Sequence, residues 1–138
     1  MHITLEADYA VRIVELLAES GEKLGAQAIS ENTGVPVRFA LKILRKLVGG
    51  GLVQSFKGAH GGYLLARSPA EITLRQVIEA VEGPFLISRC LQEEYTCDHA
   101  SCRFHKIYNE VSAMVRDKLD SFTFDQTAGK EDCTKIER

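Results

Sequence analysis

Residues 33–66 read TGVPVRFALKILRKLVGGGLVQSFKGAHGGYLLA. Between residues 37 and 48 of this stretch, apolar residues recur at spacings of three and four, which predicts a helix with one buried face. Pro36 suits the first turn of that helix, where a missing N–H costs little, and three consecutive glycines end it. The residues that we expect to face the core are Ala40, Ile43, Leu44 and Leu47.

A strand hairpin is expected directly after this helix. Residues 52–56 and 62–66 are short runs of strand-forming composition, and the sequence KGAHG at 57–61 joins them. Upstream, residues 5–18 and 26–32 show helical periodicity, and a glycine turn leads from the second of these helices to Pro36. A helix–turn–helix pair followed by a glycine-rich hairpin is typical of a winged helix-turn-helix. The predicted fold class is therefore mainly α with a small β-hairpin wing.

Charge is distributed unevenly along the chain. The formal net charge is −2, yet no acidic residue occurs between Asn32 and Arg67. Residues 68–138, in contrast, carry 9 basic and 13 acidic side chains. A positive surface on a mildly acidic body favours a nucleic-acid partner, whereas the alternative is a solvated face without a partner.

The basic helix and the hairpin tip are expected to contact double-stranded DNA. A helix fits the major groove, and a tip built from glycines can approach the DNA backbone closely. The predicted DNA-binding residues are Arg38, Lys42, Arg45, Lys46, Lys57 and His60. We expect the first two at base edges, the next two at phosphates and the last two at the wing, where the histidine has the alternative of an ordinary loop residue. Phe39 is interpreted as a helix-packing residue.

Three cysteines lie close together in the pattern C-x6-C-x4-C-x2-H. They are Cys90, Cys97 and Cys102, and the histidine is His105. Thiolates bind soft metals and iron–sulfur clusters, but these gaps match neither ferredoxin-type runs nor the usual zinc spacing. Buried structural cysteines are the alternative, which the polar run QEE at 92–94 disfavours. The spacing alone indicates a metal or redox site.

Four short motifs connect these features. They are DYAVR at 8–12, GLV at 51–53, KGAHGGYLL at 57–65 and IEAVEG at 78–83, with the first loop cysteine a short distance beyond. Over residues 1 to about 122 the chain resembles the Rrf2 family of bacterial regulators, which includes the iron–sulfur cluster regulator and the nitric-oxide-sensing repressor. This resemblance implies a winged-helix dimer in which the long C-terminal helix crosses between subunits.

The resemblance also implies an iron–sulfur ligand set of Cys90, Cys97 and Cys102. The uneven gaps of six and four residues depart from the pattern of the iron–sulfur cluster regulator, which leaves cluster type and target genes open. His105 is the expected fourth ligand because it follows Cys102 by one helical turn and matches the histidine of that regulator. Asp8 is the alternative, at the position where the nitric-oxide-sensing repressor supplies a carboxylate from the partner subunit. The third possibility is that neither binds, with Asp8 stabilising the N-terminal end of its helix and His105 in solvent. Mixed ligation favours a 2Fe–2S centre over 4Fe–4S, and a structural zinc at the same cysteines is the other cofactor that we consider.

An apolar stripe runs along the helix expected from about residue 104 to residue 121. Its members are Ile107, Val111, Val115 and Leu119. We expect the stripe to pack against a second subunit, which predicts a homodimer and a palindromic operator. Packing against its own domain is the alternative.

The expected organisation has four parts. They are a winged helix-turn-helix DNA-binding domain (1–83), a cysteine-rich sensor loop (84–103), a dimerisation helix (104–122) and a disordered tail (123–138) that contains the free thiol Cys133. The N-terminus lacks the pattern of a signal peptide, and no apolar run is long enough for a membrane span, so a cytoplasmic location is expected. A repressor controlled by a cluster is the leading hypothesis. A regulator with a zinc or thiol-redox site and an electron carrier are the alternatives, and no enzyme signature is apparent.

Overall fold

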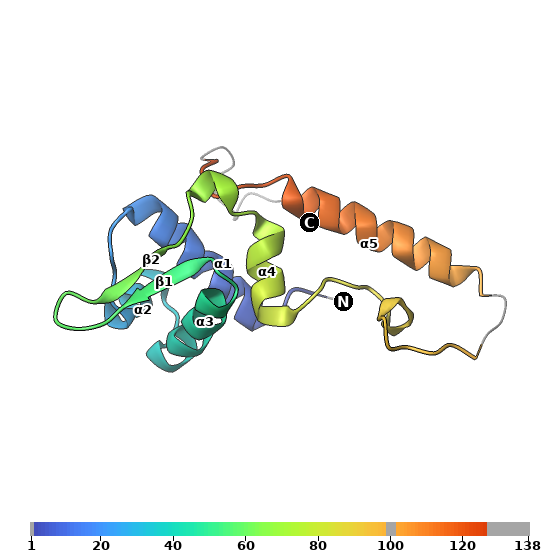
Figure 1. The fold of residues 1–138 in the computed structure, drawn as a ribbon, viewed down its shortest axis with the longest axis horizontal. Coiled ribbons are helices and arrows are strands. Elements are labelled where there is room, and N and C mark those ends of the chain that lie inside the picture. Colours follow the sequence, from blue (N-terminus) through green and yellow to red (C-terminus); the bar gives the residue numbers. More distant parts are fainter. Residues whose placement is uncertain (1, 99–101, 127–138) are drawn as a thin grey trace.

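The computed structural model describes residues 2–98 and 102–126 (Figure 1). Within these residues the elements are α1 (Leu5–Ser20), α2 (Ala26–Thr33), α3 (Val37–Gly49), β1 (Val53–Phe56), β2 (Gly62–Leu65), α4 (Leu74–Glu82) and α5 (Phe104–Asp120), with short 3-10 turns at Pro69–Glu71 and Arg89–Leu91. Each expected helix and strand is present, with ends that differ from the prediction by at most two residues. The mainly helical fold with one hairpin wing is confirmed.

The helix–turn–helix has a sharp turn between its two helices, and a glycine in the left-handed backbone conformation makes that turn. Gly34 follows α2 with a φ of 75°, and its N–H donates to the carbonyl of Ser30 at 2.9 Å. A side chain is strained at such a φ, whereas glycine adopts it readily. Pro36 then precedes α3 and directs the chain into the next helix.

The wing is tied to the helical body by a third extended segment. β1 and β2 pair antiparallel, with Val53 opposite Leu65 and Phe56 opposite Gly62. Tyr63 in β2 also exchanges two main-chain hydrogen bonds with Leu24, at 2.8 and 3.1 Å, just before α2. A Cβ at Gly62 would approach the Leu24 carbonyl oxygen to 3.0 Å, so glycine permits this close approach.

The core lies between α1, α3 and α4. The predicted inner face of α3, which consists of Ala40, Ile43, Leu44 and Leu47, is buried with exposures of 0 or 1%. The cluster also contains residues of α1 and α4, of α2 and of the start of the wing, among them Ala10, Ile13, Val77, Ile78, Ile29, Leu52 and Val53. Fully burying an aliphatic side chain is worth about 1.5–3 kcal/mol, so this face holds α3 against the body.

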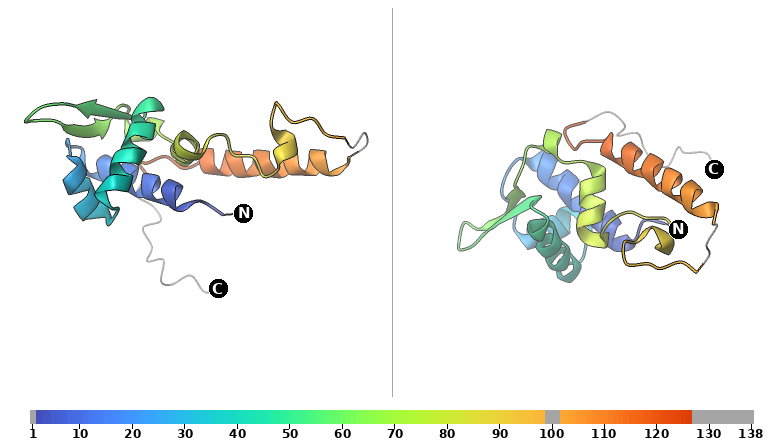
Figure 2. Two further views of the ribbon diagram at one scale, coloured as in Figure 1. Left: turned by 90° about the horizontal axis from the view of Figure 1, so that it is seen from below. Right: turned by 45° about the vertical axis from the view of Figure 1, so that its right-hand side comes forward.

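The segment after α4 leads away from the winged-helix body, and α5 begins at the far end and returns alongside it to the body (Figures 1 and 2). Its C-terminal end is anchored, because Leu119 packs against the core cluster. None of the helices in the ranges described is long and apolar enough to cross a membrane.

The segment expected as a disordered tail begins with ordered residues. Thr123 forms a β-bridge with Thr73, and the Phe124 N–H donates to the carbonyls of Pro69 and Ile72 at 3.1 and 3.2 Å. Phe124 also packs against the core cluster, which supplies the burial that a tail would lack. The expected boundary at residue 123 is therefore wrong for 123–126, and Cys133 lies outside the described residues.

Candidate DNA-binding surface and cysteine loop

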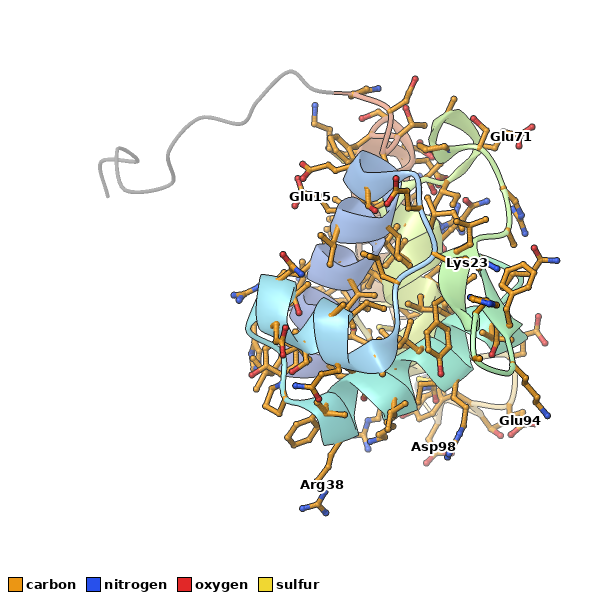
Figure 3. The ribbon with its side chains drawn as sticks, turned by 90° about the vertical axis from the view of Figure 1, so that its left-hand side faces the viewer. Glu15, Lys23, Arg38, Glu71, Glu94 and Asp98 are labelled. Carbon is orange, nitrogen blue, oxygen red and sulfur yellow. The ribbon has the colours of Figure 1, made fainter. Side chains whose placement is uncertain are left out.

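The face of α3 opposite the core is open to solvent. Arg38, Lys42 and Arg45 are exposed along it, as expected from their spacing. Figure 3 shows Arg38 at the start of α3 pointing away from the body. The N-terminal residues of a recognition helix are those that reach base edges most readily. This face can therefore present guanidinium and ammonium groups to the major groove of DNA.

Apolar side chains share this outward face, a feature that the charge pattern did not reveal. Leu41 and Val48 are 39% and 37% exposed. Together with Arg45 of α3 and Ser55 and Tyr63 of the wing they line a groove of about 280 Å³. Apolar contact of this kind is one way in which proteins read thymine methyl groups.

The wing carries further exposed basic side chains. Lys57 and His60 are exposed in the hairpin tip. Lys23, which sequence reasoning missed, lies with its ammonium 4.8 Å above the centre of the Phe56 ring. It precedes α2 and reaches the wing because its neighbour Leu24 bridges to Tyr63. A lysine in a short polar linker carries no periodic signal in the sequence. Its position beside the wing became visible only because the structure pairs Leu24 with Tyr63.

Lys46 differs from the other predicted DNA-binding residues. Its Nζ lies 2.7 Å from Oε1 of Glu6 in α1 and donates to the Val81 carbonyl at 3.3 Å. The hydrogen bond from Lys46 holds the pKa of Glu6 below its ordinary value, so the carboxylate stays charged further into the acidic range. The expectation that Lys46 contacts DNA phosphates stays a prediction. In this structure, which contains no DNA, its ammonium is paired with Glu6, a residue that the sequence did not single out.

Two further predictions concern residues on or beside α1. Phe39 contacts the Tyr9 ring, with a centroid separation of 6.4 Å, so it packs between helices while remaining 53% exposed. Asp8, the alternative fourth ligand, forms an ion pair with Arg12 one turn further along α1 at 2.9 Å. Its carboxylate is thus already matched by a guanidinium on its own helix.

The described part of the cysteine loop is open. Cys90 is half-buried in the 3-10 turn Arg89–Leu91, where its Sγ lies 3.1 Å from Oγ of Ser88. Cys97, Cys102 and His105 are exposed. Among residues 2–98 and 102–126, no three histidine, cysteine or carboxylate side chains are close enough together to hold a metal ion. Thiol and imidazole donors suit an iron–sulfur or zinc site, but in the described residues these side chains do not lie close enough together to share one metal ion.

The base of the loop, by contrast, is held by hydrogen bonds from both flanking helices. Glu79 of α4 accepts from the Phe85 N–H at 3.0 Å, and Arg116 of α5 donates to the Phe85 carbonyl at 3.1 Å. Ser112 of α5, which is fully buried, accepts from the Ile87 N–H at 3.2 Å. The loop is therefore attached to α4 and α5 just before Cys90.

The apolar stripe of α5 divides into two parts. Val115 and Leu119 are partly buried and line a pocket with Ile3, Ile78 and Phe85 of the same chain. Toward the helix N-terminus the exposed apolar residues are Phe104, Ile107, Tyr108, Val111 and Met114, with exposures between 38 and 70%. The expectation that all four predicted residues face another subunit is corrected at Leu119, which packs against the core of its own chain. For Ile107, Val111 and Val115 it stays a prediction.

Comparison with known proteins gives consistent matches over nearly the whole chain. The Rrf2 family, described as an iron-dependent transcriptional regulator, matches residues 3–130. Protein aau3 of Rhizobium meliloti is 33% identical over 128 residues, which are 91% of this chain and 83% of that protein. The transcriptional regulator IscR of Pectobacterium carotovorum is 30% identical over 139 residues, covering 99% of this chain and 84% of its own.

The solved structures agree on the fold. CymR of B. subtilis, described as the global cysteine regulator, superposes with a TM-score of 0.77 at 23% identity, covering 96% of this chain and 99% of its own. At this identity the likeness shows a shared fold, which consists of the winged helix and the long C-terminal helix.

Proposed function

This chain belongs to the Rrf2 family of transcriptional regulators, and from that premise we propose that α3 and the wing bind operator DNA under the control of the cysteine loop. The observation that carries the proposal is the outward face of α3, where Arg38, Lys42 and Arg45 are exposed within a stretch without acidic residues. We assign Arg38 and Lys42 to base edges, and Arg45 to phosphates.

Lys57 and His60 at the wing tip are assigned to the DNA backbone. Both are exposed, and the tip carries no acidic residue that would repel phosphate. Phosphate contacts fix the register of a protein on the duplex, whereas base contacts supply sequence preference. The wing and α3 thus have separate tasks that mutation can distinguish.

We further propose that the protein acts as a two-fold dimer on a palindromic operator. The exposed apolar side chains at the N-terminal half of α5, which include Ile107 and Met114, support this assembly. Burial of such a face removes apolar surface from water, and two-fold pairing of the subunits requires two half-sites in the DNA.

For the control element, we propose an iron–sulfur cluster held by Cys90, Cys97 and Cys102. Three thiols with a nearby imidazole are the donor types that such clusters use, and His105 is preferred as fourth ligand because it follows Cys102 by one helical turn. The donors support 2Fe–2S in preference to 4Fe–4S. A bound cluster would supply a redox-active centre in the loop, adjacent to the segment that α4 and α5 hold.

A thiol-redox switch is the second candidate, favoured by the exposure of Cys97 and Cys102. Exposed thiols can be oxidised by a peroxide, with two thiols giving up two protons and two electrons to form one disulfide while the peroxide is reduced. Zinc at the same cysteines is a third arrangement, in which the metal is structural.

Anaerobic purification tests the cluster proposal directly. The expected result is a brown protein with visible absorption, containing iron and acid-labile sulfide in similar amounts, whose DNA affinity changes when the cluster is removed. A colourless protein with zinc would contradict it. A colourless, metal-free protein whose DNA affinity changes reversibly with peroxide and dithiothreitol would favour the thiol switch instead.

A further inference from the structure

Glu6 lies where the N-terminal turn of α1 meets the recognition helix. Its Oε1 is 2.7 Å from Nζ of Lys46 and 3.7 Å from Nζ of Lys42. The Glu6 side chain is 29% exposed, so the carboxylate is partly withdrawn from solvent. The acid-free surface of α3 therefore has one carboxylate beside it, contributed by a residue far away in the sequence.

Lys46 is held from two sides. Besides the carboxylate of Glu6 it donates to the main-chain carbonyl of Val81 at the end of α4, at 3.3 Å. The next residue, Glu82, accepts hydrogen bonds from the main chain and the hydroxyl of Thr4, the residue that caps α1. Lys46 thus belongs to a set of polar contacts that connects α1, α3 and α4.

Lys42 is held far more loosely. Its 3.7 Å separation from Glu6 is too long for a hydrogen bond, and its side chain is 61% exposed, compared with 36% for Lys46. Two lysines one turn apart on the same helix therefore differ in their freedom to reach another anion. A phosphate can recruit Lys42 at little cost, whereas recruiting Lys46 would leave the partly buried carboxylate of Glu6 without its counter-ion.

We propose that Glu6 is an intramolecular counter-ion that withholds Lys46 from DNA, so that α3 presents Arg38, Lys42 and Arg45 to the duplex and uses Lys46 to position α3 on α1 and α4. This inference rests on the proposed DNA-binding function. Each additional phosphate contact strengthens binding to any sequence equally. Glu6 accordingly limits non-specific affinity while the base-reading residues remain available.

A double-mutant cycle tests the proposal through the salt dependence of binding to a duplex of unrelated sequence. Glu6→Gln should release Lys46, raise the affinity and steepen the plot of log affinity against log salt by about 0.9 for each subunit. Lys46→Met alone should leave the slope unchanged, and the double variant should return to the parental slope. Glu15→Gln is the control, because it removes the same charge from an exposed position of α1 remote from Arg38 (Figure 3).

Two results would overturn the inference. One is a Glu6→Gln slope equal to that of Glu15→Gln, and the other is a flatter slope in Lys46→Met alone. If Glu6→Gln does not fold, as judged by thermal unfolding, Lys46→Met still decides between the outcomes. Failure of the DNA-binding function itself would look different, because Arg38→Ala and Lys57→Ala would then also leave binding unaltered.

Discussion

The main-chain N–H of Ile87 donates to Oγ of Ser112 at 3.2 Å, which joins the base of the cysteine loop to a fully buried hydroxyl-bearing residue of α5. Replacing Ser112 by Ala would leave that N–H without its acceptor inside the protein. We expect the free energy of unfolding to fall by about 1–3 kcal/mol, measured by urea denaturation. Ser55→Ala, at an exposed position of β1, is the control and should change it little.

The salt dependence of operator binding reports the phosphate contacts. If a dimer makes roughly eight of them, the slope of log affinity against log salt is roughly −7. Lys57→Ala should weaken binding to operator and unrelated duplex alike, and should flatten the slope by about one for each phosphate that the lysine no longer neutralises. Fluorescence anisotropy at several salt concentrations measures both quantities. An unchanged slope would show that Lys57 of the wing makes no phosphate contact.

Arg38→Ala should act differently because its role is assigned to base edges. We expect a loss of about 1–3 kcal/mol on the preferred operator and a smaller loss on unrelated DNA. Lys42→Ala should resemble it. Equal losses on both DNAs, measured by competition, would reassign these side chains to phosphates.

Assembly is tested at the exposed half of α5. The parent chain should sediment as a dimer at micromolar concentration, and Ile107→Glu or Val111→Glu should shift it toward monomer because each would place a charge in an apolar interface. Phe56→Glu introduces the same charge at an exposed apolar position of the wing and should remain dimeric. A monomeric parent would contradict the proposed two-fold dimer.

The fourth ligand is tested by comparing His105→Ala with Asp8→Ala after cluster reconstitution. Loss of an imidazole ligand should change the visible spectrum and lower the reduction potential, because histidine ligation raises the potential of a 2Fe–2S centre. Asp8→Ala should leave both unchanged. The reverse pattern would transfer the role to the carboxylate.

The positions of the helices and of the hairpin followed from the sequence because their signals are local. The inner face of α3 was identified by spacing alone, and its four residues are buried in the structure. Glycine and proline turns marked the ends of the elements, since they restrict the backbone where they stand. Exposure of Arg38, Lys42 and Arg45 likewise follows from the periodicity of a single helix.

The partner of Lys46 could not be read from that periodicity. Glu6 lies in another helix, and only the packing of α1 against α3 and α4 places its carboxylate beside the ammonium. The division of the α5 stripe has the same origin, because packing against the core of its own chain partly buries Leu119 but leaves Ile107 exposed.

By itself, the sequence determined which segments are helical, which faces are apolar and where the cations and thiols lie along the chain, because hydrophobic periodicity and backbone restriction act over a few residues. Tertiary structure decided which cation is already paired and which apolar residues are already covered. It also decided that the chain continues to pack at Phe124. These properties depend on contacts between segments far apart in sequence, and charge pairing and burial are set by distance in space.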